Sequence, residues 1–215
     1  MSLKILLADD HMIVRRGLSI LLNNEQDMEV VAQAENGQAA VELAAKLSPD
    51  IVVMDIAMPD LNGIEAARRI LARNPAIHII ALSVHSEKQF VVEMFRAGAS
   101  GYILKDCAFE ELTQAIHAVT KNRKYLSPAI AHIVLEGCLR HESRSASSAY
   151  ALLTPRERQV LQLLSEGWKT RNIAAYLKVS TKTVESHRLH IMRKLNLHNI
   201  AGLTKYAVRE GLTSL

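Results

Sequence analysis

Five polar side chains in the first half of the chain each stand at the end of a short apolar run. They are Asp9, Asp10, Asp55, Ser83 and Lys105. An open parallel sheet binds its ligands outside the carboxyl ends of its strands, at the point where the winding changes direction. In the strand order 2-1-3-4-5 the first and third strands are neighbours there. The three carboxylates are therefore predicted to converge.

Three carboxylates in one crevice repel one another unless a cation neutralises them. Mg²⁺ suits Asp9, Asp10 and Asp55, because it takes a few carboxylate oxygens and leaves a place for a phosphoryl oxygen. Lys105 and the Ser83 hydroxyl can then bind the other phosphoryl oxygens. An aspartate can itself accept the phosphoryl group as an aspartyl phosphate. These residues predict phosphoryl chemistry with Mg²⁺ as cofactor.

A simpler interpretation treats the same residues one by one. Asp10 and Asp60 could be helix caps or turn residues, and Lys105 could be a solvated surface lysine. Each residue alone fits that account. Five suitable side chains at strand ends are less expected by chance, so the combination favours a site.

The elements that must position these residues alternate along the chain. The apolar runs are LKILLA, EVVAQA, IVVMD, HIIALS and GYIL. Segments with helical periodicity follow them at 12–22, 37–46, 63–73, 87–97 and 109–121. Parallel strands need crossover connections, and strands covered on both faces read as continuous apolar runs. We therefore predict an α/β fold with a five-stranded, doubly wound parallel sheet.

The pattern changes after residue 121. Ser127 followed by Pro128 is typical of a helix start, and the apolar positions favour a helix over 128–139. Residues 140–149 are rich in Ser, Ala and charge and lack periodicity, which is typical of a flexible linker. The boundary between two domains is predicted in 140–149, within a linker at 122–149.

The remaining residues, 150–215, read as a small all-helical domain. Thr154, Pro155 and Glu157 combine a capping box with proline at the first helical position, which predicts a helix to about residue 166. Further helices are predicted at about 170–178, 181–195 and 200–210. Residues 151–215 hold 11 Lys and Arg against 4 Asp and Glu, a balance of +7, whereas residues 1–150 balance at −3. A basic excess confined to one domain indicates an anionic partner.

The predicted helix 181–195 has one apolar stripe that includes Val184, Ile191 and Leu195. Its opposite face carries Lys182 and Arg193, with polar residues beside them. A short helix, a tight turn and a helix with a basic outer face form the helix-turn-helix plan of DNA-binding domains. An ordinary amphipathic helix with a solvated face is the alternative.

The first part of the chain resembles the receiver domain of bacterial two-component response regulators. The resemblance rests on ADDH at 8–11, VVMDIAMPDLNGIEA at 52–66, ALSVHS at 81–86 and AGASGYILKD at 97–106, and it covers roughly 1–121. It implies a flavodoxin-like fold with Asp55 as the phosphoacceptor. It also implies that Asp10 and Asp55 bind Mg²⁺ directly, Asp9 through water, and Ala57 through its backbone carbonyl.

The same resemblance implies a phosphate-sensing switch. Ser83 and Lys105 are its sensing pair, and Tyr102 is the aromatic residue whose rotamer reports the state of Ser83. The sensing hydroxyl is serine here, where many relatives carry threonine. A half-buried strand aromatic is the simpler account of Tyr102.

Residues 150–215 are similar to the DNA-binding domain of the NarL/LuxR type. The resemblance rests on LTPRERQVLQLLSEG, IAAYLKVSTKTVESHRLHIMRKL and KYAVREGL, and it implies that 181–195 is the recognition helix. The residues predicted to contact phosphates are Lys182, Thr183, Arg188 and Lys194. Those predicted to reach base edges are Glu185, Ser186 and Leu189. The helix at 200–210 resembles the family's dimerisation helix, and a core-packing helix is the alternative.

Together these features predict a phosphorylation-activated transcription regulator rather than an enzyme. Its predicted partners are a sensor histidine kinase, double-stranded DNA and a second copy of the chain. No apolar stretch approaches the roughly 20 residues of a membrane helix, so a cytoplasmic location without membrane contact is expected. Two alternatives stay open: a Mg²⁺-dependent phosphatase with an aspartyl nucleophile, and a regulator that binds DNA independently of phosphorylation. The phosphatase class places a second acid two residues after its nucleophile, where this chain has Ala57.

Overall fold

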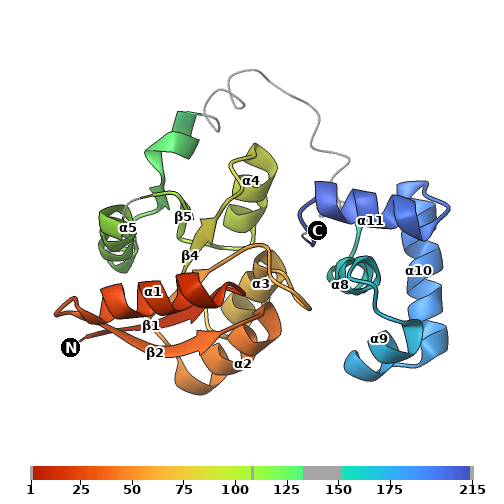
Figure 1. Cartoon of the computed structure of the whole chain (residues 1–215), viewed down its shortest axis with the longest axis horizontal. Coiled ribbons are helices and arrows are strands. Elements are labelled where there is room, and N and C mark those ends of the chain that lie inside the picture. Colours follow the sequence, from red (N-terminus) through yellow and green to blue (C-terminus); the bar gives the residue numbers. More distant parts are fainter. Residues whose placement is uncertain (1, 108, 133–151, 214–215) are drawn as a thin grey trace. The chain divides into compact units, whose positions relative to one another are not determined.

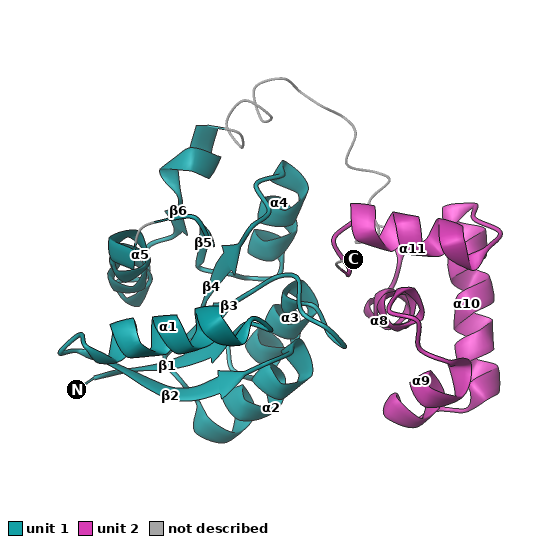
Figure 2. Ribbon diagram, in the orientation of Figure 1, with its two compact units in different colours: residues 1–141 teal, residues 142–215 magenta. Residues whose placement is uncertain are grey.

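The computed structural model of the chain describes residues 2–107, 109–132 and 152–213. The chain divides into two compact units, Met1–His141 and Glu142–Leu215 (Figure 2). Within the described residues, no helix is long and apolar enough to cross a membrane.

The first unit is built on a parallel sheet (Figure 1). Its strands are β1 (Leu3–Ala8), β2 (Met28–Ala34), β3 (Ile51–Met54), β4 (His78–Ser83), β5 (Gly101–Leu104) and β6 (Tyr125–Leu126). The strand order is β2-β1-β3-β4-β5-β6, so the predicted order of the first five strands is confirmed.

The prediction of only five strands is wrong, because β6 adds a short parallel strand beside β5. β6 has two residues, too few to show any periodicity in the sequence. It lies within 122–149, the segment predicted as a linker, so part of that segment belongs to the sheet. The predicted helix after Ser127 begins at residue 128 and continues through residue 132. The rest of the predicted helix, and the predicted flexible stretch 140–149, lie outside the described residues.

Five helices alternate with the strands of this unit. They are α1 (Met12–Asn23), α2 (Gly37–Leu47), α3 (Gly63–Arg73), α4 (Lys88–Arg96) and α5 (Phe109–Thr120). Each end lies within one residue of its predicted position. Asparagine side chains cap two of the helices: Asn36 accepts a hydrogen bond from the amide of Ala39, and Asn62 accepts one from Glu65.

Helices cover both faces of the sheet. On one face, Leu22 of α1 and the apolar side of α5 pack against Ile5, Val53 and Ile103. Helices α2, α3 and α4 contact one another in turn and reach the sheet at β1 and β5. All four residues of β3 are buried, as expected for a central strand covered on both sides.

Within residues 152–213, the part of the second unit that the structure describes, all regular elements are helices. This part contains α8 (Pro155–Ser165), α9 (Thr170–Tyr176), α10 (Thr181–Leu195) and α11 (Ile200–Arg209), in agreement with the four predicted helices to within two residues. The predicted capping box of α8 is present, because Thr154 and Glu157 each bind the other's backbone amide. One core cluster includes Val160, Ile173 and Val184, with Trp168 packed against it. This core fixes α9 and α10 on either side of a tight turn (Figure 1).

Candidate functional site

Strand register brings the predicted residues to one edge of the sheet. Ala8 of β1 pairs with Met54 of β3, so Asp9 and Asp55 are the next residues on neighbouring strands. The amide of Asp55 donates a hydrogen bond to the carbonyl of Ala8 at 2.7 Å, which continues the pairing into the site. On the other side of β4, the amide of Lys105 donates to the carbonyl of Ser83 at 2.8 Å. The four residues therefore meet at the carboxyl edge.

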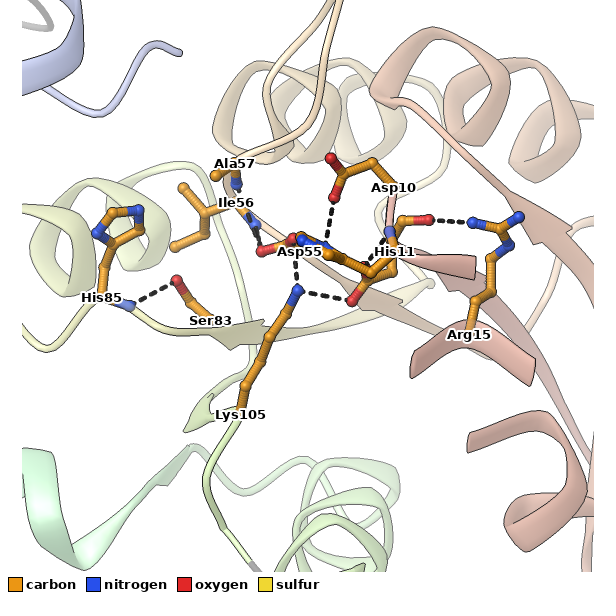
Figure 3. A network of polar contacts seen from close by, with 10 residues as sticks. Asp10, His11, Arg15, Asp55, Ile56, Ala57, Ser83, His85 and Lys105 are labelled. Atoms are coloured by element: carbon orange, nitrogen blue, oxygen red, sulfur yellow. Dashed lines mark hydrogen bonds and ion pairs between the residues drawn. The ribbon is translucent and has the colours of Figure 1, made fainter. Parts of the chain in front are cut away.

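Lys105 bridges two of the three carboxylates (Figure 3). Its Nζ lies 2.7 Å from Oδ2 of Asp55 and 2.8 Å from Oδ2 of Asp9. The side chains of Asp55 and Asp9 are only 3% and 5% exposed, whereas that of Lys105 is 12% exposed. The simpler account of Lys105 as a solvated surface lysine does not fit these contacts.

Burial and charge act in opposite directions on this pair. Burial raises the pKa of Asp55 above its ordinary value, and the ammonium group of Lys105 offsets only part of that effect. Burial alone would lower the pKa of Lys105, but the charge and hydrogen bonds of Asp55 and Asp9 outweigh it, so this pKa is raised. The lysine therefore keeps its charge and balances the buried carboxylates.

The other oxygen of Asp55 is held by backbone amides. Oδ1 accepts hydrogen bonds from the amides of Ile56 at 2.7 Å and Ala57 at 3.4 Å (Figure 3). With Oδ2 on Lys105, the carboxylate has one orientation at the end of β3. A carboxylate held in this way would need little reorganisation before a reaction.

Asp10 is more exposed than Asp9 and Asp55, and its contact is with a residue that we did not predict. Nδ1 of His11 lies 2.8 Å from Oδ1 of Asp10 and 3.1 Å from Oδ1 of Asp9. Ligand atoms of Asp9, Asp10, His11 and Asp55 all lie within 4.8 Å of one another. The carboxylates suit a hard divalent cation, so the residues fit the predicted metal. His11 follows the paired aspartates directly, and that adjacency is the signal that could have pointed to it.

The predicted switch residues lie beside this cluster. Ser83 is fully buried, and its Oγ accepts a hydrogen bond from the amide of His85 at 3.1 Å. Tyr102 is also fully buried, and its hydroxyl donates to the carbonyl of His85 at 2.8 Å. Burial raises the pKa of Tyr102, which keeps this hydroxyl a neutral donor. The backbone of His85 therefore connects the two side chains.

Helix α10 presents the face that the sequence predicts. Val184 and Ile191 are buried in the domain core. The predicted contact residues Lys182, Glu185, Ser186 and Leu189 are all exposed. Leu189 is 57% exposed, which is unusual for a large apolar side chain and suits a side chain that meets a partner. Thr183 and Arg188 are partly buried.

Lys194 has a second role that the helical wheel did not show. Its Nζ lies 2.7 Å from Oε2 of Glu157, so it joins the end of α10 to the capping box of α8. Its side chain is 40% exposed, whereas that of Glu157 is 6% exposed. A direct contact of Lys194 with DNA phosphate stays a prediction.

Comparison with known protein families defines the class of protein. Residues 5–117 match the response regulator receiver domain, and residues 151–207 match the bacterial regulatory proteins of the luxR family. The chain belongs to the response regulators, in the group that joins a receiver domain to a LuxR-type DNA-binding domain.

Similar proteins share both parts. The chain is 34% identical to the transcriptional regulatory protein DegU of Brevibacillus brevis, over 98% of this chain and 94% of DegU. It is 35% identical to the oxygen regulatory protein NreC of Staphylococcus carnosus, over 98% and 99% of the two chains. Among solved structures, it resembles RcsB from Salmonella enterica serovar Typhimurium, bound to a promoter in the presence of the phosphomimetic BeF3⁻. That match has a TM-score of 0.62 and 27% identity, over 99% of this chain and 100% of that chain.

Proposed function

We propose that this response regulator accepts a phosphoryl group on Asp55 from a sensor histidine kinase and that phosphorylation controls DNA binding by α10. The observation that carries the proposal is the position of Lys105, whose Nζ contacts the buried carboxylates of both Asp55 and Asp9. A cation shared by two acids at the carboxyl edge of a parallel sheet is suited to holding a transferred phosphoryl group.

The transfer forms one bond and breaks one. A carboxylate oxygen of Asp55 attacks the phosphorus of the donor phosphohistidine, the P–N bond breaks, and the histidine nitrogen keeps the bonding electron pair. The product is an aspartyl phosphate. The ammonium group of Lys105, which now contacts the Asp55 carboxylate, would then bind the phosphoryl oxygens. The backbone amide of Ile56 keeps Oδ1 of Asp55 in place.

Asp9, Asp10, Asp55 and the carbonyl of Ala57 are the residues that we propose to hold Mg²⁺. When bound, the ion supplies positive charge to the phosphoryl oxygens during transfer. The acidic side chains converge closely enough to share one ion. The role of the Ala57 carbonyl rests on the family resemblance alone.

We propose that Ser83, Tyr102 and Lys105 report the new phosphoryl group to the rest of the receiver. If the Ser83 side chain turns so that its hydroxyl donates a hydrogen bond to a phosphoryl oxygen, its Oγ moves away from the amide of His85, from which it now accepts one. A shift of the His85 backbone would in turn affect Tyr102, whose hydroxyl donates a hydrogen bond to the carbonyl of His85. To convert a mostly inactive population into a mostly active one, the phosphoryl group must favour the active state by about 5 kcal/mol.

On the DNA side, we propose phosphate contacts from Lys182, Thr183, Arg188 and Lys194 and base contacts from Glu185, Ser186 and Leu189. The exposed face of α10 and the bound promoter in the RcsB structure support this assignment. We also propose that the chain binds DNA as a homodimer, consistent with a second RcsB structure, 27% identical with a TM-score of 0.60, that holds two dimers on two parallel DNAs.

The proposed domain limits separate the phosphate-accepting part of the chain from the DNA-binding part. We propose a receiver at 1–121, a connecting segment at 122–149 and a DNA-binding domain at 150–215. A non-enzymatic regulator of this kind would act in the cytoplasm, where its DNA lies.

A phosphatase is the alternative that the sequence left open. Its second acid would stand two residues after Asp55, at the position of Ala57, which supports regulation instead. Incubation of the protein with small phosphate esters and Mg²⁺ separates the two functions. We expect at most one phosphoryl group per chain, and sustained hydrolysis would identify an enzyme.

The central experiment is footprinting on genomic fragments with and without a small phosphodonor and Mg²⁺. We expect the donor to strengthen protection by the wild-type protein and to leave Asp55→Ala unchanged. If both proteins respond alike, phosphorylation of Asp55 does not control DNA binding. If neither responds although the wild-type protein is phosphorylated, DNA binding is independent of phosphorylation.

A further inference from the structure

His11 lies directly before α1 and caps it in an unusual way. It is the N-cap residue, a position where Ser, Thr, Asp or Asn normally binds the backbone of the helix. The His11 side chain makes no such bond, and its ring turns toward the paired aspartates instead (Figure 3). Its backbone amide donates to Oδ1 of Asp9 at 2.8 Å, which holds the residue close to the cluster.

Asp9 divides its two oxygens between two neighbours. Oδ2 lies on the ammonium group of Lys105, and Oδ1 lies 3.1 Å from Nδ1 of His11. The carboxylate of Asp55 also contacts Lys105. For Asp10, by contrast, His11 is the only ion-pair or hydrogen-bond partner of the side chain among the described residues, at 2.8 Å. Lys105 therefore neutralises one side of the cluster, and the side with Asp10 and His11 is open to another cation.

The spacing of these atoms fits neighbouring positions around one metal ion. Two ligands at right angles, each about 2.1 Å from a metal, lie about 3.0 Å apart. Nδ1 of His11 lies 2.8 Å from Oδ1 of Asp10, the direct ligand that the family resemblance implies, and 3.1 Å from Oδ1 of Asp9. These are also hydrogen-bond distances, so the proton that Nδ1 shares with the carboxylates is released when a metal ion binds there. The ring is 64% exposed, so no packed neighbour prevents a small adjustment.

We infer that His11 is an additional ligand of the metal site and that it shifts the site's selectivity from Mg²⁺ toward Mn²⁺ and related transition ions. Mg²⁺ strongly prefers oxygen ligands, whereas imidazole nitrogen favours first-row transition metals. A site of carboxylates plus one imidazole suits Mn²⁺, which accepts both. This inference rests on the proposed metal site and adds the ion that the site selects.

The test measures metal binding directly on the full-length protein. Free Mn²⁺ is followed by electron paramagnetic resonance during titration, and Mg²⁺ is then added as a competitor. The variants are His11→Ala and, as a matched control, His117→Ala, which changes a receiver histidine outside the cluster. Far-UV circular dichroism checks that each variant is folded. We expect His11→Ala to weaken Mn²⁺ binding by at least about tenfold and Mg²⁺ binding by less than about twofold, and His117→Ala to match the wild-type protein.

A second measurement identifies the ligand atom. Electron spin echo spectroscopy of bound Mn²⁺ detects a coordinated ¹⁴N, and we expect that signal in the wild-type protein and its loss in His11→Ala. If Mn²⁺ binds without nitrogen coupling, or if both ions weaken equally in His11→Ala, His11 acts only through hydrogen bonds and the inference is wrong, while the proposed metal site stands. If the wild-type protein binds neither ion, the proposed site itself fails.

Discussion

The α-carbon of Gly63 packs directly against the carbonyl group of Asp55. A Cβ atom built on Gly63 would lie 2.0 Å from that carbonyl oxygen and 2.9 Å from its carbon. The amide of Gly63 also donates to the carbonyl of Ile56 at 2.9 Å. The first residue of α3 therefore has to lack a side chain for the helix to start so close to the proposed phosphoacceptor.

Gly63→Ala tests this contact. The clash is with backbone rather than with a flexible side chain, so we expect the free energy of unfolding of the receiver to fall by at least about 1–3 kcal/mol, the usual cost of overpacking. Urea unfolding followed by circular dichroism measures it. Gly17→Ala is the matched control, because nothing lies within 4 Å of its Cβ position in α1. Gly17→Ala should stabilise the protein by about 0.5–1 kcal/mol. Equal stability of the two variants would contradict the structural relationship.

Lys105→Met tests the charge balance of the site. Lys105 lowers the pKa of Asp55 against the effects of burial and of the nearby charge of Asp9, and its ammonium group contacts both carboxylates. Without it, the pKa of Asp55 should rise further, which lowers the ionised fraction of Asp55 at a given pH. Carboxyl ¹³C NMR across a pH titration of the metal-free protein measures the change. Lys121→Met, at an exposed lysine, should leave the Asp55 titration as it is, and an unshifted pKa in Lys105→Met would show that the ion pair has little effect.

The lowered pKa of Glu157 predicts that the stability of the helical domain depends on pH. Burial by itself would raise the pKa of Glu157, but hydrogen bonds from Lys194 and Thr154, together with the charge of Lys194, hold it below its usual 4.5. The unfolded chain then binds the proton more tightly than the folded domain. The stabilisation is therefore complete above pH 4.5 and is lost as the pH falls through the lower folded pKa.

Two substitutions separate the cap from the ion pair. Glu157→Gln keeps a side chain that can complete the capping box, whereas Glu157→Ala removes both contacts. We expect Glu157→Ala to be less stable than Glu157→Gln by about 1 kcal/mol. The gap between wild type and Glu157→Gln should shrink below pH 4.5. Trp168, the only tryptophan, packs on this core, so its fluorescence follows urea unfolding of the domain. A gap that is constant with pH would exclude the ion pair as its source.

The two kinds of DNA contact proposed for α10, to phosphates and to bases, can be distinguished by their dependence on salt. Lys182→Ala should weaken binding to all sequences alike and reduce the slope of log K against log salt by about 1, because one phosphate contact is lost. Leu189→Ala should instead change the preference among base sequences and keep the slope. Fluorescence anisotropy on a footprinted site and on an unrelated duplex measures both. Lys46→Ala, at an exposed lysine of the receiver, is the lysine control and should keep the wild-type slope. The same slope for Lys182→Ala and wild type would remove Lys182 from the phosphate contacts.

The sequence by itself determined the order of the elements and the residues of the pocket. Buried parallel strands read as apolar runs, and polar residues at their ends stand out against them. For this reason Asp9, Asp55 and Lys105 were recognisable before any fold was known. The outward face of α10 could also be predicted from the sequence, because helical periodicity assigns each residue to one side of the helix. Strand β6 could not be predicted, because a strand of two residues is too short to show an alternating pattern.

Only the tertiary structure decided how these residues contact one another. The pairing of Ala8 with Met54 places Asp9 beside Asp55. The 2.7 Å contact of Lys105 Nζ with Asp55 brings the lysine of a third strand end to the same carboxylates. The same is true of His11 beside Asp10 and of Lys194 on Glu157. Such contacts depend on strand register and on the packing of one helix against another. Local sequence patterns report the direction of a side chain from its own element but do not report which distant atom it meets.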